Sequence, residues 1–311
     1  MEEKFETPAA EEETLTEDGA DIKPRKPWVA FILSLLTPGL GQIYNGQLKK
    51  GLLFLGLLFI PLIIASAKFI HNFNGFAWLV LVELLLRLYI IVDSIRFAKT
   101  QTEFIPKKYN SWYYHLLFAS GIVSLFQIFP PHKVLRIHSF NISTESNMPA
   151  MMPDDKVVAN LEEYNGRKPQ YGELVAFNSP QGGVWTFRVV GLPGDKIDFD
   201  GSFLTVNAKK CKVTRVGSKE INGWPMIEYV EELPNGYKHH ILLYNGDDGG
   251  KRESRQLTVP QDSFYLMGDN RDNALDSRFI GPIGGENILG RLLYTYWGDN
   301  IDRINIDLTR Q

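Results

Sequence analysis

Four long apolar runs fill the first part of the chain, at about residues 28–44, 51–67, 76–95 and 112–129. A membrane-spanning helix needs about 20 apolar residues. The two later runs reach that length, and the second does so when the lysines before it extend to the membrane surface. The first run is broken halfway by Thr37-Pro38-Gly39, which favours a re-entrant or interfacial element. The pattern predicts a helical membrane domain at 28–100, then a cytoplasmic loop and a final anchor helix at 101–130.

Basic residues set the expected orientation of these helices, because loops rich in Lys and Arg stay in the cytoplasm. Four of them separate the third and fourth runs: Arg96, Lys99, Lys107 and Lys108. Lys49, Lys50 and a basic collar at 23–26 place both ends of the first run on the same side. We therefore expect three crossings and one re-entrant element, with everything after Phe129 outside the cytoplasm. Four full crossings would instead put the N-terminal tail outside or the C-terminal part inside.

The first 27 residues form a separate region. Residues 1–22 carry nine acidic side chains and one lysine, Lys4. Such a segment has too little apolar surface to fold alone, so we expect a disordered tail ahead of the basic collar. It lacks the basic start of a secretory signal peptide.

Two charged residues, Glu83 and Arg87, lie in the middle of the third apolar run at helical spacing. Charges at that depth usually face a bundle interior and pair with each other. A conduction or substrate path is the alternative, but no further polar residues line that face. We interpret the two residues as a structural pair.

From residue 137 the pattern changes to short alternating runs separated by Gly, Pro, Asn and Asp. Seven runs stand out: 156–160, 173–177, 184–190, 203–206, 239–244, 263–267 and 291–297. Many short strands with such turns are typical of an all-β domain. We expect a β-rich domain over 131–311, with an extended ribbon in the charged region at 207–238.

Composition excludes several classes of function. The net charge is −3 and the pI is about 6.1, so no overall basic field favours nucleic acid as a partner. The single cysteine, Cys211, rules out an internal disulfide and a cysteine-based metal site. The histidines lack metal-ligand spacing, and the adjacent pair His239 and His240 sits in a predicted strand, where neighbours point to opposite faces. We expect no metal and no cofactor.

Three polar clusters recur along the predicted β-rich domain: Ser146-Asn-Met-Pro149, the run F-R-V-V-G-L-P-G-D-K at 187–196, and the run M-G-D-N-R-D-N-A-L-D-S-R at 267–278. Each alone is ambiguous, since a Gly-Leu-Pro-Gly-Asp run is usually a turn between strands. The third run lacks the ligand spacing of a calcium loop. In this order, behind a final apolar run, the three clusters resemble bacterial signal peptidase I, the membrane serine protease that removes leader peptides. The resemblance covers about residue 112 to the end and implies the mostly-β fold of that family.

The N-terminal part carries a different resemblance. The segment P-G-L-G-Q-I-Y-N-G-Q-L-K-K-G at 38–51, with V-D-S at 92–94, resembles a small bacterial helical-hairpin membrane domain. That family implies an anchor and no particular chemistry.

The resemblance to signal peptidase I implies a site. It makes Ser146 the nucleophile and Thr144 a donor in the oxyanion hole, together with the backbone N–H of Ser146. Donors aimed at the developing negative oxygen stabilise the transition state by about 3–4 kcal/mol each. Framework positions of the family also match, and we expect them to form a structural polar network: Arg188, Asp269, Arg271, Asp276 and Arg278.

Two positions depart from the family's pattern. The family uses a lysine of depressed pKa as the base, immediately before Arg-Val-Val, and this chain has Phe187 there. The family orients that lysine with a small hydroxyl residue two positions before Asp-Ser-Arg, and this chain has Ala274. A phenyl ring neither accepts nor donates a proton. The proton acceptor and its orienting partner are both missing, while the framework remains.

Two hypotheses follow. One is a serine endopeptidase that cleaves leader peptides after small residues at the outer face of the bacterial inner membrane, with Ser146 and a replacement base. The other is a catalytically silent relative that binds extended leader peptides by strand addition or regulates an active peptidase. Phe187 and Ala274 favour the second. The expected partners are membrane lipid, exported preproteins and another signal peptidase. An unrelated β-rich scaffold would require the ordered motifs to be coincidental.

Overall fold

The structure is a computed structural model that describes residues 24–57, 60, 72–128, 136–200, 203–246 and 255–310. The chain divides into two units, which we call the helical unit (1–69 and 76–135) and the β-rich unit (70–75 and 136–311). The acidic tail predicted at 1–22 lies outside the described residues, as does most of the second half of the apolar run at 51–67.

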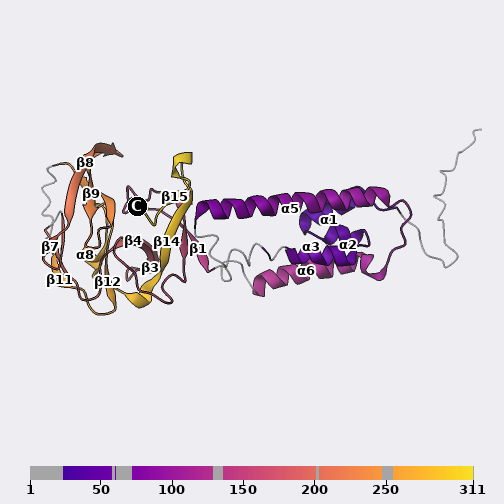
Figure 1. The fold of residues 1–311 in the computed structure, drawn as a ribbon, viewed down its shortest axis with the longest axis horizontal. Helices are drawn as coiled ribbons and strands as arrows, with labels where there is room; N and C mark the ends of the chain where they lie inside the picture. The colour runs from indigo at the N-terminus through magenta and orange to yellow at the C-terminus, as the bar shows by residue number, and fades with distance from the viewer. Residues whose placement is uncertain are drawn as a thin grey trace, which may run out of the picture. The chain divides into compact units, whose positions relative to one another are not determined.

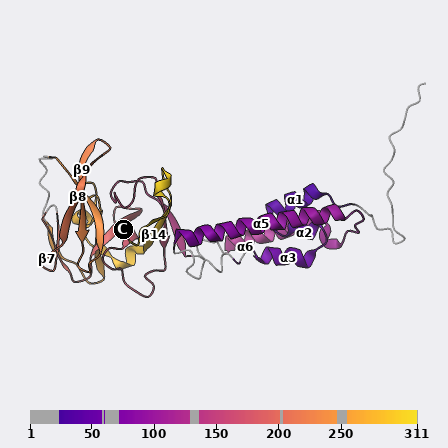
Figure 2. The same ribbon diagram turned by 45° about the horizontal axis from the view of Figure 1, so that its top comes forward.

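The helical unit contains five α-helices and one short 3-10 helix among its described residues: α1 (Pro27–Leu36), α2 (Leu40–Tyr44), α3 (Leu48–Leu57), α5 (Phe73–Thr100), η2 (Lys108–Asn110) and α6 (Trp112–Ile128). In both views the short helices lie alongside part of α5 (Figure 1, Figure 2). Within the described part of the chain, α5 alone is long and apolar enough to cross a membrane. Because α6 has 17 described helical residues, the expected three crossings stay a prediction.

The expected break in the first apolar run is confirmed, since α1 ends at Leu36 and α2 begins at Leu40. Gly39 between them has a φ of +94°, a conformation that glycine adopts without steric cost. A Cβ atom on Gly41 would lie 2.0 Å from Ser34 Oγ, so α1 and α2 approach closely only because this residue is glycine. The glycines of the Pro38–Gly51 segment thus have a packing role.

Polar side chains of the same segment bond to α5. Gln42 Nε2 donates to the Ile90 carbonyl at 2.8 Å and to Asp93 Oδ2 at 3.0 Å. Asn45 Nδ2 donates to the Ser94 carbonyl at 2.7 Å. The glycine-rich segment and Val92–Ser94 are therefore one packed motif, and α5 continues beyond it to Thr100. Earlier in α5, Arg87 Nε donates to Glu83 Oε1 at 2.8 Å, so the expected pairing is confirmed, but the Arg87 side chain is 44% exposed among the described residues and does not face an interior.

The β-rich unit consists of short strands with a few helical turns. Its strands are β1 (Ile137–Asn141), β2 (Lys156–Asn160), β3 (Leu174–Asn178), β4 (Val184–Gly191), β5 (Lys196–Phe199), β6 (Leu204–Val206), β7 (Lys209–Lys210), β8 (Lys212–Ile221), β9 (Trp224–Glu232), β10 (Lys238–Tyr244), β11 (Arg255–Thr258), β12 (Ser263–Met267), β13 (Ile283–Gly284), β14 (Ile288–Trp297) and β15 (Ile306–Asp307). Its helical turns are α8 (Ser277–Ile280), η3 (Gly285–Asn287) and η4 (Ile301–Arg303). The predicted runs at 156–160 and 263–267 coincide with β2 and β12.

Three sheets make up the unit. The largest has the strand order β1-β2-β14-β3-β4-β12-β13, with β15 paired to β14. A second sheet has the order β11-β5-β6-β7. The third is the ribbon expected at 207–238, where β8 and β9 form an antiparallel hairpin that β10 extends. The Gly-Leu-Pro-Gly-Asp run is the expected turn, and it connects β4 of the first sheet to β5 of the second.

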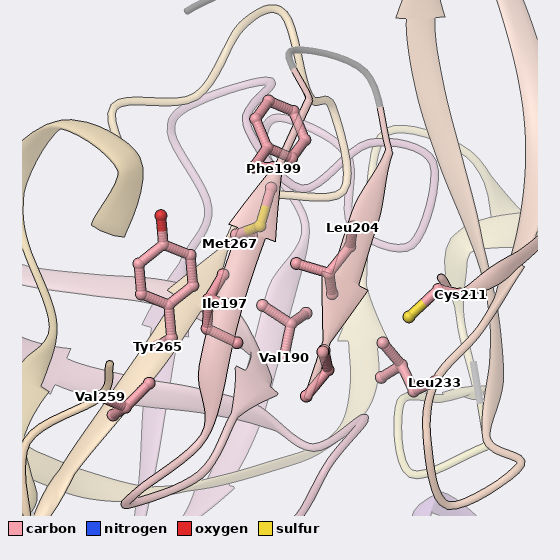
Figure 3. Packing of buried hydrophobic residues seen from close by; sticks show 10 residues of the cluster. Val190, Ile197, Phe199, Leu204, Cys211, Leu233, Val259, Tyr265 and Met267 are labelled. Atoms are coloured by element: carbon pink, nitrogen blue, oxygen red, sulfur yellow. The ribbon is translucent and has the colours of Figure 1, made fainter. Parts of the chain in front are cut away.

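The core of the unit contains separate apolar clusters between these sheets. In the cluster of Figure 3, side chains from β4, β5, β6 and β12 point toward one another, among them Val190, Ile197, Leu204 and Met267. Cys211, between β7 and β8, is buried in the same cluster, so the interpretation of this cysteine as a small apolar residue is confirmed and its placement in a strand is wrong. A second cluster on the other part of β4 contains Phe187 and borders the site described next.

Candidate functional site

The loop between β1 and β2 carries Ser146, and buried contacts hold it in place. Met148 and Met151 are fully buried and anchor the loop in the core. Asp155, also buried, accepts a hydrogen bond from the backbone N–H of Met152 at 2.8 Å and forms an ion pair with Arg303. Because buried contacts fix this loop to the core at several points, its side chains are held in defined positions.

Two neighbouring segments fix the backbone around Ser146. The amide Nδ2 of Asn147 donates to the Thr186 carbonyl of β4 at 2.6 Å. The backbone N–H of Asn270, in the loop after β12, donates to the Ser146 carbonyl at 3.0 Å. Ser146 therefore lies between β4 and the polar loop at 268–273, as the order of the three sequence clusters requires.

A groove of about 370 Å³ opens beside Ser146. Its walls come from the end of β1, the loop that follows, the first half of β4 and the loop before α8, and they include Phe140, Thr144, Ser146, Trp185, Phe187 and Leu275. Thr144 and Ser146 both line this groove, so the structure brings the two predicted site hydroxyls together. Among the described residues, no lysine, histidine or carboxylate lines it, and the Ser146 hydroxyl makes no hydrogen bond.

The ring of Phe187 occupies an apolar environment next to Ser146. Only 4% of the residue is exposed. Its ring centroid lies 5.8 Å from that of Phe177 and 6.2 Å from that of Trp185. Ala274, half-buried, packs against the same cluster. The place at which the family resemblance expects an amine is therefore filled with carbon.

Gly268 shows how closely these positions meet. A Cβ atom at Gly268 would lie 2.5 Å from the Ala274 Cβ, 2.5 Å from the Ser146 carbonyl oxygen and 3.3 Å from the Phe187 ring. The sequence-predicted nucleophile and the two departures from the family pattern thus surround one glycine. Ser146, Phe187 and Ala274 are 41 and 87 residues apart in the sequence (187 − 146 and 274 − 187), and the fold brings them together.

The edge of β4 that faces the groove lacks a strand partner at its start, where Asn147 Nδ2 is bonded to the Thr186 carbonyl. Residues 184–187 pair with β3 on one side, whereas β12 pairs with β4 only from Arg188 onward. Within the described chain, no strand covers the other side of 184–187. An unpaired strand edge beside a groove is the arrangement that accepts an extended peptide as an additional strand.

The framework residues form buried contacts behind this site. Arg188 and Asp269 are at most 1% exposed, and Arg188 Nε and Nη2 donate to the two carboxylate oxygens at 2.8 and 2.7 Å. Burial acts to lower the pKa of Arg188, but the attraction of Asp269 outweighs it and raises this pKa. Arg271 forms a second buried pair with Glu231 of β9. Both pairs are bidentate.

Asp276 and Arg278 connect this network to the loop at the site. Asp276 Oδ2 accepts a hydrogen bond from the backbone N–H of Gly268 at 2.9 Å. Arg278 Nη2 donates to Asp276 Oδ2 at 2.8 Å and to the Arg271 carbonyl at 2.6 Å. These contacts fix the loop at 268–278, and with it the backbone donor that holds Ser146.

His239 of β10 is buried inside the network and was not among the predicted site residues. Its Nε2 lies 3.4 Å from Glu231 Oε2 and 3.7 Å from Asp269 Oδ1. Neither ring nitrogen makes a hydrogen bond within the described residues. Burial, followed by the charges of Arg188 and Arg271, lowers the pKa of His239 well below 6.5, so the ring is neutral.

We expect this histidine to make the stability of the protein pH-dependent. The unfolded chain binds a proton at His239 near pH 6.5, and the folded chain does not, so the free energy of unfolding falls below about pH 6.5 by up to about 1.4 kcal/mol per unit. His239→Gln should reduce this slope by one proton, whereas His240→Gln, at the exposed neighbour, should not. Denaturant titrations from about pH 5 to pH 8, followed by tryptophan fluorescence in detergent micelles, measure how the free energy of unfolding changes with pH. Identical slopes in all three proteins would contradict the expectation.

Sequence reasoning missed several residues of the site. Trp185 and Asn147 contact the groove or the loop beside it, and Glu231 and His239 complete the polar network. Glu231 and Arg271 carry complementary charges, but a separation of 40 residues gives no local signal that they pair. For Asn147 the signal was present, since it stands within the first sequence cluster. No group of three or more potential metal ligands occurs among the described residues.

The chain is similar to known proteins over its C-terminal part. The family model described as "Signal peptidase, peptidase S26" matches residues 111–297. Signal peptidase I of Buchnera aphidicola subsp. Schizaphis graminum is 28% identical over 230 residues, with 54% of this chain and 72% of that protein covered. Signal peptidase I of Rickettsia typhi is 31% identical over 158 residues, with 46% of this chain and 60% of that protein covered. The match thus spans less than two thirds of the Rickettsia protein.

One solved structure is also similar. A crystal structure of a signal peptidase I from Enterococcus faecalis V583 aligns with 40% of this chain and 97% of that chain, at 22% identity and a TM-score of 0.25.

Proposed function

Because the chain belongs to the signal peptidase I family of membrane-anchored serine peptidases, we propose that it binds the leader peptides of exported proteins beside Ser146 and does not cleave them. The observation that supports this most directly is the environment of Phe187. Its buried ring stands where the resemblance expects the family's base, and no basic side chain lines the groove among the described residues. Removing the base from a serine peptidase removes most of its catalytic power but leaves the binding surface.

Peptide binding uses features that do not depend on the base. The side of 184–187 without a strand partner offers hydrogen bonds to an extended chain wherever Asn147 does not already bond it, and the groove side chains offer apolar contacts. The small residues at the end of a leader peptide fit beside Ser146. In this proposal, helices of the N-terminal part anchor the chain several times in the bacterial inner membrane, with the β-rich unit outside the cytoplasm.

An active peptidase is the second candidate, and one observation favours it. The hydroxyls of Thr144 and Ser146 line the same groove, as a nucleophile and an oxyanion donor require. Such an enzyme would need a base from outside the groove lining.

Binding and cleavage of one labelled leader peptide separate the two candidates. The full chain in detergent micelles is titrated with the peptide by fluorescence anisotropy, and the products are followed by mass spectrometry. We expect binding of equal strength in the natural protein and in Ser146→Ala, and turnover in neither. Turnover that vanishes in Ser146→Ala would establish the active peptidase.

A matched pair of variants tests whether the groove is the binding surface. Leu275 and Leu161 are both exposed leucines of the β-rich unit, but only Leu275 lines the groove. Leu275→Glu is expected to weaken binding about tenfold, which corresponds to about 1.4 kcal/mol, and Leu161→Glu to leave it unchanged. Absence of binding in the natural protein would overturn the proposed function.

A further inference from the structure

A second groove, of about 380 Å³, lies on the other side of the segment that carries Ser146. Thr144 and Ser146 line the first groove, and Glu145 between them lines the second. The opposite wall is formed by the tip of the β8–β9 hairpin, with Trp224, and by the end of β10, with Tyr244. The segment 144–146 is thus a wall that the two grooves share.

The lining of the second groove suits a cation. Trp224 is 60% exposed, and its ring centroid lies 5.6 Å from that of Tyr244. Aromatic faces attract ammonium and guanidinium groups. Among the described lining residues, the charged ones are Glu145 and Asp272, and both are acidic.

Glu145 is held in position for such a ligand. Asn222 Nδ2 donates to its Oε1, and Asn273 Nδ2 donates to its Oε2 at 3.1 Å. A carboxylate accepts about four hydrogen bonds, so both oxygens retain acceptor capacity toward the groove. The side chain is oriented before any ligand arrives, which lowers the entropic cost of binding.

Asn270 adds an acceptor that lacks a donor. The residue lines the groove and is 4% exposed. Its Nδ2 donates to the Glu145 carbonyl at 3.2 Å, while its Oδ1 is buried and accepts no hydrogen bond from the described residues. Buried carbonyl oxygens are nearly always hydrogen-bonded in folded proteins. An unpartnered one in the wall of a groove indicates that a ligand donates to it.

We propose that the second groove binds a lysine or arginine side chain of a peptide whose neighbouring residues lie beside Ser146. The ammonium or guanidinium group lies against Trp224 and Tyr244 and donates to Glu145 and to Asn270 Oδ1. Glu145 directly precedes Ser146, and consecutive Cα atoms are about 3.8 Å apart, so this cation lies within a few residues of the peptide residue at Ser146. The inference rests on the proposed function and narrows the ligands to leader peptides followed closely by a basic residue.

Peptides that differ in one charge test the inference. One series carries arginine at the first, second, third or fourth position after the small residue, and a matched series carries citrulline, which is neutral and of the same shape. We expect the full chain in micelles to bind the best arginine peptide about tenfold more tightly than its citrulline partner. Glu145→Gln should reduce this preference, and Glu286→Gln, at an exposed carboxylate outside both grooves, should leave it unchanged.

Reversing the charge at Glu145 is expected to reverse the preference between peptides, a result that a misfolded variant would not give. In Glu145→Lys, a glutamate peptide should bind more tightly than the arginine peptide. Equal binding of arginine and citrulline peptides by the natural protein would overturn the inference while the proposed function stands. A preference that survives Glu145→Gln unchanged would also overturn it. If neither series binds, the proposed function itself fails.

Discussion

Replacement of Arg188 by methionine is expected to lower the free energy of unfolding of the β-rich unit by about 3–5 kcal/mol, because removal of one partner leaves a buried charge uncompensated. Arg188 is fully buried, and Asp269 is 1% exposed. The guanidinium also donates to the Gly172 carbonyl at 2.7 Å, so methionine leaves that acceptor without a partner as well. Urea titration of the full chain in micelles, followed by tryptophan fluorescence, measures the loss.

Two comparisons show whether the loss comes from the unpaired carboxylate. The double variant Arg188→Met with Asp269→Leu should recover most of the stability, because apolar residues often replace a buried ion pair at little cost. Lys210→Met breaks the pair of Lys210 with Asp200, whose nitrogen and oxygen are 3.3 Å apart and exposed, and should change stability by less than about 1 kcal/mol. A double variant as unstable as the single one would show that packing, not charge, is lost.

The fold was largely predictable wherever the pattern is local. The alternating runs of β2 and β12 and the helix break after Leu36 are marked by neighbouring residues, and the structure has them where the sequence placed them. The break follows from Pro38 and Gly39, which need no distant contact to end a helix. The charged ribbon at 207–238 was also expected, since its turn residues are local signals.

The parts that could not be predicted depend on contacts between distant residues. The unpaired side of β4 at 184–187 appears only when the pairing of β12 with β4 is known. Sequence gives the order of strands along the chain but not their order in a sheet. The unpartnered Oδ1 of Asn270 is of the same kind, because the residue that its side chain contacts, Glu145, lies 125 positions earlier in the sequence.

The glycine-rich segment at 38–51 was recognised as a motif without a physical reason. The structure supplies one, since Gly41 and Gly51 allow close approach and Gln42 and Asn45 bond to α5. Buried amides that bond a neighbouring helix are costly when one partner is lost. The motif is therefore required for packing of the helical unit, and its residues do not imply a separate chemistry.

Replacement of Phe187 by lysine, together with Ala274→Ser, is expected to produce peptidase activity that depends on Ser146. The introduced amine enters the apolar cluster of Phe177 and Trp185, where desolvation favours its neutral form. The introduced hydroxyl lies near enough to orient it, since Ala274 and Phe187 both pack at Gly268. A positioned general base contributes a factor of about 10²–10⁴, so cleavage of a leader peptide should rise by that factor over Phe187→Met with Ala274→Ser.

The same substitution has a stability signature that shows where the amine lies. A buried lysine has a pKa below 10.4, so the unfolded chain binds more protons than the folded chain, and stability rises with pH by up to about 1.4 kcal/mol per unit until about pH 10.4. Phe187→Met should show no such rise.

If the slope appears and cleavage does not, the amine is buried at the site but Ser146 is not placed to use it. Activity that persists when Ser146→Ala is added would assign the hydrolysis to another group. Activity that vanishes with it would mean that the scaffold still aligns a nucleophile and that the natural chain lacks only the proton acceptor and its orienting hydroxyl.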